Sequence, residues 1–205
     1  MEPKVMALLF AAGAAGGVVN AIAGGATLIT FPAMLAAGLP PVVANASNAV
    51  AISPGHLIAA VADRAKLPAA DRRLALSLAA ATLGGIAGAL LLLALPEAAF
   101  LQPVPLLIGL ATALFAFAPR IQAWAARRRE GAAPSALAGS AALAAVSVYG
   151  GFFGAGLGVM LSALLAIEDP DDIRRVKVMK NLLATAVTVS YTHLRAHVTR
   201  GNLVC

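Results

Sequence analysis

The chain is 205 residues long, 60% of them hydrophobic and 12% charged, with a formal net charge of +6. About a quarter of the residues in a soluble domain are charged, so this composition excludes an ordinary soluble fold. The basic residues occur in short clusters between long apolar stretches, as in the loops of membrane proteins, which argues against nucleic-acid binding. We therefore predict an all-α, polytopic helix bundle whose partner is the lipid bilayer.

Six apolar blocks follow one another along the chain. No Asp, Glu, Lys or Arg occurs between Lys4 and Asp63. A bilayer-spanning helix needs about 20 apolar residues, whereas a soluble amphipathic helix would show polar positions every third or fourth residue. The first apolar run continues beyond the core length of a signal peptide, so we expect no cleavage. The blocks cover residues 5–38, 41–62, 74–95, 104–117, 135–167 and 176–190.

The first and fifth blocks are long and interrupted by glycine. The first contains Gly24, Gly25 and Pro32, and the fifth contains a run of glycines between 150 and 158. Glycine and proline weaken a helix interior. This pattern predicts that each of these blocks forms a broken helix or a re-entrant hairpin.

The Lys and Arg residues predict the orientation in the membrane. The loops 63–73 and 120–133 each carry four of them, and the connection 96–103 carries none. Cytoplasmic loops are enriched in Lys and Arg, so we expect both basic loops in the cytoplasm and a multi-pass protein of the inner (plasma) membrane. We expect the first block to cross once, because Lys4 then also lies inside; a hairpin there would place the N-terminus outside.

An internal repeat relates the two glycine-rich blocks. Gly17 and Gly24 correspond to Gly151 and Gly158 with a single offset of 134. Glycine-broken segments in matching positions of two halves are the best sequence indication of a transporter's binding site.

A second polar spot follows the glycines in each half. These polar positions within apolar helices are 45–48 and 180–181, and Asn48 corresponds to Asn181 with an offset of 133. We therefore divide the chain into a first transmembrane repeat, 1–130, and a partial second repeat, 131–190. The composition changes abruptly after that, and we expect the remainder, 191–205, to be a non-native tail.

The motifs around these positions carry a resemblance to a known family. They read G-V-V-N-A-I-A-G-G-A-T-L-I-T-F-P over 17–32, G-L-P over 38–40 and A-N-A-S-N over 44–48, then Y-G-G-F-F-G-A-G-L-G over 149–158 and K-N over 180–181. With them the chain resembles the sulfite exporter TauE/SafE family of membrane transporters from about position 7 to 190. The resemblance implies two repeated halves of about eight helices in total, of which about six spans are present here. It also implies export of sulfite, sulfonates or related small organic anions.

Glycines, amides and hydroxyls in these motifs are the candidate substrate-binding groups. The free N–H groups and positive dipole at the start of a half-helix attract anions, and glycine lets an oxyanion approach the backbone. Amide and hydroxyl groups can donate to the same anion. The candidates are Gly24, Gly25, Gly154, Gly156, Gly158, Asn20, Thr27, Asn45, Asn48 and Asn181.

Lys180 is the single candidate with a charge. A charged side chain at the centre of a membrane helix costs roughly 2.5–3.5 kcal/mol on insertion scales and indicates a functional role. The alternatives are snorkelling of Lys180 to the interface and close packing or helix–helix hydrogen bonding for the glycines and amides. His56 has no partner in the sequence, so a packing role is expected for it; proton coupling is the alternative, because an imidazole titrates near neutral pH.

Other classes of function fit the sequence less well. The acidic residues 168–172 could suggest a membrane-embedded, metal-dependent enzyme, but Pro170 breaks the run and no catalytic motif accompanies it. A non-transporting membrane subunit is a further alternative. We expect a secondary transporter, not an enzyme, with no cofactor and no metal; a homo-oligomer is compatible with the sequence.

Overall fold

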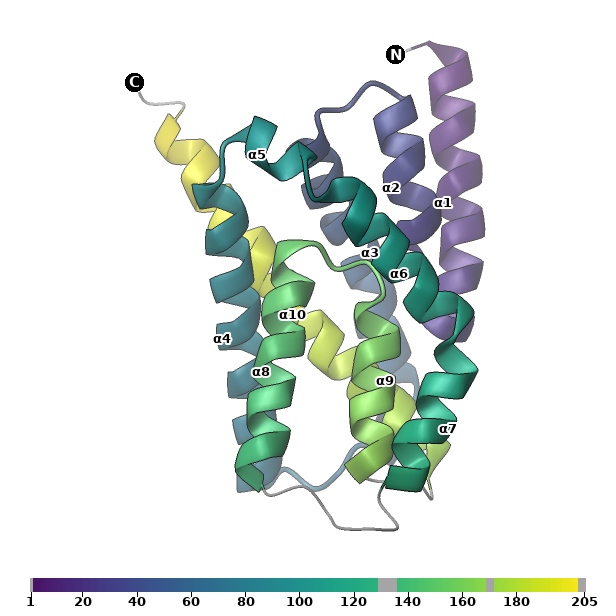
Figure 1. Cartoon of the computed structure of the whole chain (residues 1–205), viewed down its shortest axis with the longest axis vertical. Coiled ribbons are helices and arrows are strands. Elements are labelled where there is room, and N and C mark those ends of the chain that lie inside the picture. Colours follow the sequence, from purple (N-terminus) through teal and green to yellow (C-terminus); the bar gives the residue numbers. More distant parts are fainter. Residues whose placement is uncertain (1, 129–135, 169–171, 203–205) are drawn as a thin grey trace.

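The computed structural model describes residues 2–128, 136–168 and 172–202, and these residues form helices with no strand among them (Figure 1). This confirms the predicted all-α membrane bundle. The elements are α1 (Pro3–Ala23), α2 (Thr27–Ala36), α3 (Pro41–Ala62), a 3-10 turn (Arg64–Lys66), α4 (Arg72–Ala94), α5 (Glu97–Leu101), α6 (Val104–Ala116), α7 (Ala118–Arg128), α8 (Ala136–Phe152), α9 (Leu157–Glu168) and α10 (Ile173–Asn202).

The surface of the bundle is apolar, as expected of helices that face lipid. Phe10 is 80% exposed, Leu106 75% and Ile58 68%. Among the described residues, three segments are long and apolar enough to cross a membrane, namely Pro3–Asn20, Arg72–Ala94 and Ala98–Ala116. Because apolar side chains of this size cover the outside of several helices, the bilayer supplies the environment that a soluble core would otherwise provide.

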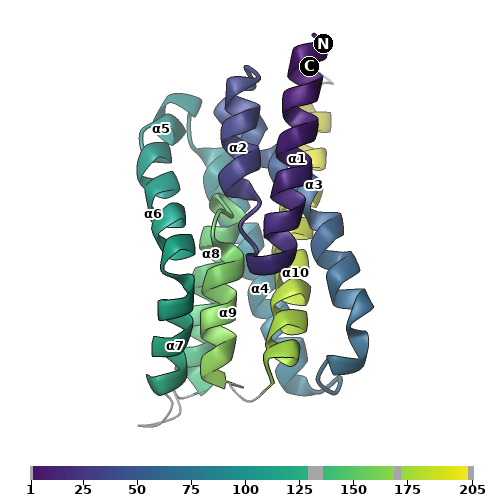
Figure 2. The same ribbon diagram turned by 90° about the vertical axis from the view of Figure 1, so that its right-hand side faces the viewer.

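The first apolar block is a hairpin. Helix α1 runs from one end of the bundle to about its middle, and α2 returns beside it to the same end (Figures 1 and 2). The expectation of a single crossing is therefore wrong: the start of α1 lies at the end of the bundle opposite the connection 63–71. Hydropathy did not reveal this, because an apolar hairpin and an apolar spanning helix have the same composition.

The second glycine-rich block forms a hairpin that enters from the opposite end. Helix α8 rises from the end that carries the connection 63–71, and α9 returns to it (Figure 1). The helix after each hairpin, α3 or α10, then runs through the bundle, in opposite directions (Figures 1 and 2). The two halves are thus inverted relative to each other.

Helix α4 joins the first half to the second through a glycine seam. A Cβ atom on Gly151 of α8 would overlap the Gly85 carbonyl oxygen of α4, and one on Gly88 of α4 would overlap the Val148 carbonyl oxygen of α8. Small residues of this kind let membrane helices approach to backbone contact. Helix α4 also contacts α10, so it fixes the second hairpin against the following helix.

The extent of α10 bears on the end of the chain. It continues without a break from Ile173 to Asn202 and so includes most of the segment 191–205; Cys205 lies outside the described residues. That this segment is non-native stays a prediction.

Candidate functional site at the centre of the bundle

The turns of the two hairpins meet at mid-height in the bundle. A Cβ atom on Gly158 would lie only 3.0 Å from both the Cα and the carbonyl oxygen of Gly24. Gly24 also has a φ of +80°, a backbone conformation that side chains with a Cβ rarely adopt. The rings of Phe31 and Phe153 pack edge-to-face beside this contact, with centroids 5.4 Å apart. Glycine is therefore required where the two halves touch.

Two short helices begin at this meeting point. Helix α2 starts at Thr27 and α9 at Leu157, directly after the glycine turns. Several of their first N–H groups already donate to the preceding turns, those of Leu28 and Ile29 to Gly25 and Ala26 and those of Leu157 and Val159 to Gly154 and Gly156. What the start of each helix still offers is the partial positive charge of the helix dipole. Both helices therefore present the ends that favour an anion to the middle of the bundle.

Asn48 of α3 holds the first hairpin. Its side-chain nitrogen donates to the Thr27 hydroxyl at 2.9 Å, and its oxygen accepts a short hydrogen bond from the Thr30 hydroxyl. The side chain is 2% exposed. A buried amide with both ends satisfied fixes the helices that carry its partners, so Asn48 sets the position of the start of α2.

Asn45, on the same face of α3, holds the second hairpin. Its side-chain nitrogen donates to the backbone oxygen of Phe152 at 3.0 Å, at the end of α8. Neighbouring side chains of one helix are thus bonded to hairpins that enter from opposite ends. Any movement of one hairpin relative to the other must strain or break one of these amide hydrogen bonds.

Lys180 brings a positive charge to the hairpin turns. Its side chain is 5% exposed, and its Nζ would lie 3.6 Å from a Cβ on Gly24. Within the described ranges, no carboxylate forms an ion pair with it. A buried ammonium without an anionic partner is unfavourable, so an anion bound beside Gly24 would stabilise the charged form.

His56 also belongs to this site, although the sequence did not predict a role for it there. Its imidazole is 5% exposed and lines a cavity together with Asn181, the residue after Lys180 on α10. Both residues of α10 are far away in the sequence. One signal was available: Asn48, Ile52 and His56 are spaced four apart, which places them on one face of a helix.

Two cavities adjoin His56. A small one of about 20 Å³ holds no more than one water molecule. A larger one of about 240 Å³ lies beside it, among α1, α2, α3 and α10. The small cavity is lined by Gly24, Thr27, Asn45, Asn48, Ala49, Ile52, His56, Gly150, Gly151, Phe153, Gly154, Leu157, Gly158 and Thr188.

Most of the predicted site residues lie at these cavities. Six line the small cavity, Asn20 and Asn181 line the larger one, and Lys180 adjoins Gly24. The structure does not bring Gly25 and Gly156 there. A Cβ on Gly25 would lie 2.7 Å from the Phe115 ring, and one on Gly156 would lie 3.4 Å from Leu114, so these two glycines pack against α6.

The acidic residues 168–172 are partly outside the described residues, because positions 169–171 are not included. Asp172 accepts a hydrogen bond from the Arg175 backbone N–H at 3.0 Å and lies 3.6 Å from Lys66 Nζ. The Arg175 hydrogen bond and the Lys66 charge lower the pKa of this carboxyl. Asp172 thus caps α10. The described part of the chain contains no group of three or more His, Cys, Asp or Glu side chains that could hold a metal ion.

Inverted hairpins whose glycine turns meet around a buried charge define an integral membrane protein with an inverted-repeat architecture of the kind found in membrane transporters. The chain belongs to the sulfite exporter TauE/SafE family, whose sequence model matches residues 9–203. This confirms the family predicted from the motifs.

Relatives named as transporters show the same likeness. A "Probable membrane transporter protein" of Haemophilus influenzae is 31% identical over 179 residues, which are 85% of this chain and 69% of the relative. The "Probable membrane transporter protein YfcA" of Escherichia coli K12 is 29% identical over 160 residues, which are 77% of this chain and 58% of the relative. The chain thus spans about three fifths to two thirds of the length of these relatives. No solved structure matches it.

Proposed function

We propose that the protein is a secondary transporter of the inner membrane that exports small sulfur oxyanions, sulfite or sulfonates, through the meeting point of the two hairpins. The observation that carries this proposal is Lys180, a buried ammonium beside Gly24 without an ion pair among the described residues. The substrate would be its counter-ion. An oxyanion with three acceptor oxygens also suits the helix starts and the amides around this point.

Movement of the hairpins would give the substrate access to the site. The central cavity of about 20 Å³ is too small for an oxyanion, so it must enlarge before one can bind there. We expect one hairpin at a time to move away from the Gly24–Gly158 contact, which opens the site to the end of the bundle from which that hairpin enters. The basic loops 63–73 and 120–133 would face the cytoplasm, where their positive charge attracts the exported anion.

Uptake into inside-out vesicles tests the proposal. Vesicles that contain the chain should accumulate labelled sulfite or a labelled sulfonate. Lys180→Met should abolish uptake, because the counter-charge is lost. Asn48→Leu should reduce uptake about tenfold, because the start of α2 loses the two hydrogen bonds to Thr27 and Thr30 that position it, each worth about 0.5–1.5 kcal/mol. Lys177→Met, an exposed position one turn earlier on α10, is the matched control, and the amount of inserted protein is measured for each variant.

Two outcomes would contradict different parts of the proposal. Normal uptake in both Lys180→Met and Asn48→Leu would show that the substrate binds elsewhere. No uptake of sulfite or sulfonate by the unmodified chain, at normal insertion, would exclude the proposed transport activity.

A further inference from the structure

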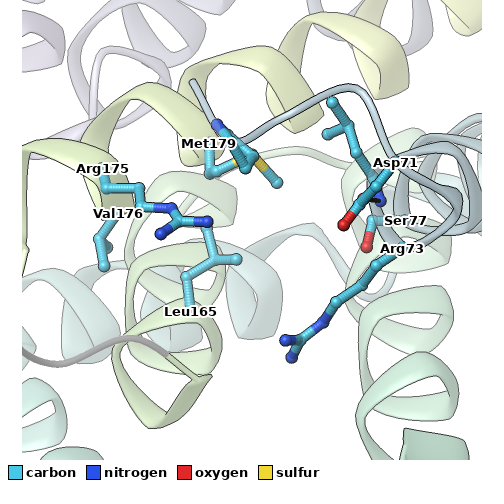
Figure 3. Close-up of a pocket in the computed structure, with 9 residues that line it drawn as sticks. Asp71, Arg73, Ser77, Leu165, Arg175, Val176 and Met179 are labelled. Atoms are coloured by element: carbon cyan, nitrogen blue, oxygen red, sulfur yellow. Dashed lines mark hydrogen bonds between the residues drawn. The ribbon is translucent and has the colours of Figure 1, made fainter. Parts of the chain in front are cut away.

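A third cavity, of about 300 Å³, lies at the end of the bundle that carries the basic loops. It is separate from the central site and is enclosed by the start of α4, the second half of α9 and the start of α10. Its lining residues are Pro68, Asp71, Arg73, Leu74, Ser77, Leu165, Arg175, Val176 and Met179 (Figure 3).

Two arginines from different halves of the protein line this cavity. Arg73 projects from α4 and Arg175 from α10, and both guanidinium groups extend into the same space (Figure 3). Ser77 adds a hydroxyl to the lining. Guanidinium groups bind sulfonate, sulfite and phosphate oxygens through paired, charge-assisted hydrogen bonds. Two of them on separate walls can bind one oxyanion from two sides.

The one carboxylate in the lining has another role. An oxygen of Asp71 accepts a hydrogen bond from the backbone N–H of Leu74 at 2.9 Å and so caps α4. The lining therefore carries two positive charges against one negative charge. Asp71 and Asp172 cap the starts of α4 and α10, so it is the two guanidinium groups, and not the helix ends, that would hold an anion in this cavity.

The cavity is also close to the central site along one helix. Val176, in its lining, precedes Lys180 by four residues on α10, which is about one helical turn. An anion that leaves the cavity toward the middle of the bundle therefore has a short distance to cover before it reaches the buried ammonium.

We propose that this cavity is a second binding site for an oxyanion group, held between Arg73 and Arg175. The group is either a free sulfite or sulfonate that waits there before it enters the central site, or the phosphate of an anionic lipid. In the first case this inference extends the proposed function; in the second it stands without it.

Equilibrium binding to the purified chain tests the proposal, with two probes. The first probe is radiolabelled sulfite, added to protein in nanodiscs of phosphatidylcholine alone. The second is phosphatidylglycerol, whose retention through detergent exchange is measured by native mass spectrometry. The test variant is the double substitution Arg73→Gln and Arg175→Gln. The matched control, Arg72→Gln and Arg174→Gln, removes two charges from neighbouring positions of the same helices that do not line the cavity.

We expect the unmodified chain to bind sulfite at two sites and Lys180→Met to retain the site at the arginines. The test variant should weaken binding at that remaining site by about tenfold or more, corresponding to at least one lost charge-assisted hydrogen bond, and the control should not. If the test variant lowers only the retention of phosphatidylglycerol, the site is confirmed as a lipid phosphate site. If neither probe distinguishes the test variant from the control, the proposal is wrong. Because this experiment measures binding, it tests the arginine site even if the transport proposed for the central site proves wrong.

Discussion

Both ends of the Asn48 side-chain amide form hydrogen bonds with the first hairpin. The Thr27 hydroxyl accepts from its nitrogen and the Thr30 hydroxyl donates to its oxygen. Thr30 is also within 2.9 Å of the Ala26 carbonyl oxygen, so it lies between the glycine turn and α3. The loss of one hydroxyl would leave a buried amide oxygen without its partner.

Thr30→Val is expected to destabilise the protein by about 1–3 kcal/mol, the usual cost of an unsatisfied buried polar group. Valine has nearly the same shape, so the change is in hydrogen bonding. The measurement is thermal unfolding in detergent, followed by circular dichroism. Thr112→Val is the control, because the exposed Thr112 donates only to its own helix, at Ile108. Equal unfolding temperatures for the two variants would show that the Asn48 oxygen does not depend on Thr30.

At the residue scale, the sequence predicted which residue types form the site but not which way each one points. Gly24 and Gly25 are adjacent, and both were candidates. Both lie in the turn between α1 and α2, where Gly24 meets Gly158 and Gly25 meets the Phe115 ring of α6. The direction that a turn residue faces depends on backbone angles, such as the φ of +80° at Gly24, that a sequence does not show. His56 was missed because its partners lie on another helix, and a sequence does not show contacts between helices.

At the level of the elements, the repeat places equivalent glycines in unequal surroundings. Gly151 of α8 is in backbone contact with Gly85 of α4, whereas its equivalent in α1, Gly17, has no atom within 4 Å of a Cβ placed on it. The two positions therefore form a matched pair for a test of helix packing within one chain.

Gly151→Ala is expected to lower stability by at least 1–3 kcal/mol, about the cost of overpacking, because α4 and α8 must separate to admit the new methyl group. Gly17→Ala should be neutral or slightly stabilising, since alanine favours helix more than glycine does. Unfolding in detergent with a gradient of denaturant compares the two. Similar losses for both variants would mean that the close approach of α4 and α8 does not contribute to stability.

The elements themselves were largely predictable. The block 41–62 is helix α3 with the same bounds, and the glycine runs correspond to the breaks between α1 and α2 and between α8 and α9. For the first block, the sequence did not show whether the chain crosses the membrane or returns to the side from which it entered. Lys4 is a single charge, and one charge near a terminus cannot outweigh the packing of α1 against α2.

At the scale of the whole molecule, the hairpin at the start has a consequence for topology. The described N-terminal residue and the connection 63–71 lie at opposite ends of the bundle (Figures 1 and 2). If the basic loops are cytoplasmic, the N-terminus is outside.

Single cysteines test this topology, in a background with Cys205→Ser. Glu2→Cys should react with a membrane-impermeant maleimide in intact cells. Ala69→Cys should react only after the membrane is permeabilised. Both positions are exposed, so access to the reagent depends on the side of the membrane. Labelling of both positions in intact cells, or of neither, would place the two on one side and contradict the hairpin.

The inverted arrangement of the two hairpins has an energetic consequence. If rotation by half a turn about an axis in the membrane plane exchanges one hairpin with the other, it also exchanges a conformation open to one side with a conformation open to the other. Two such conformations have nearly the same set of internal contacts and therefore nearly the same free energy. We expect the protein itself to favour neither direction strongly, so that the concentration gradients across the membrane determine the net flow. The two halves differ at some equivalent positions; for example, Lys180 on α10 corresponds to Ser47 on α3 in the repeat. Such positions are where the sequence can favour one of the two conformations.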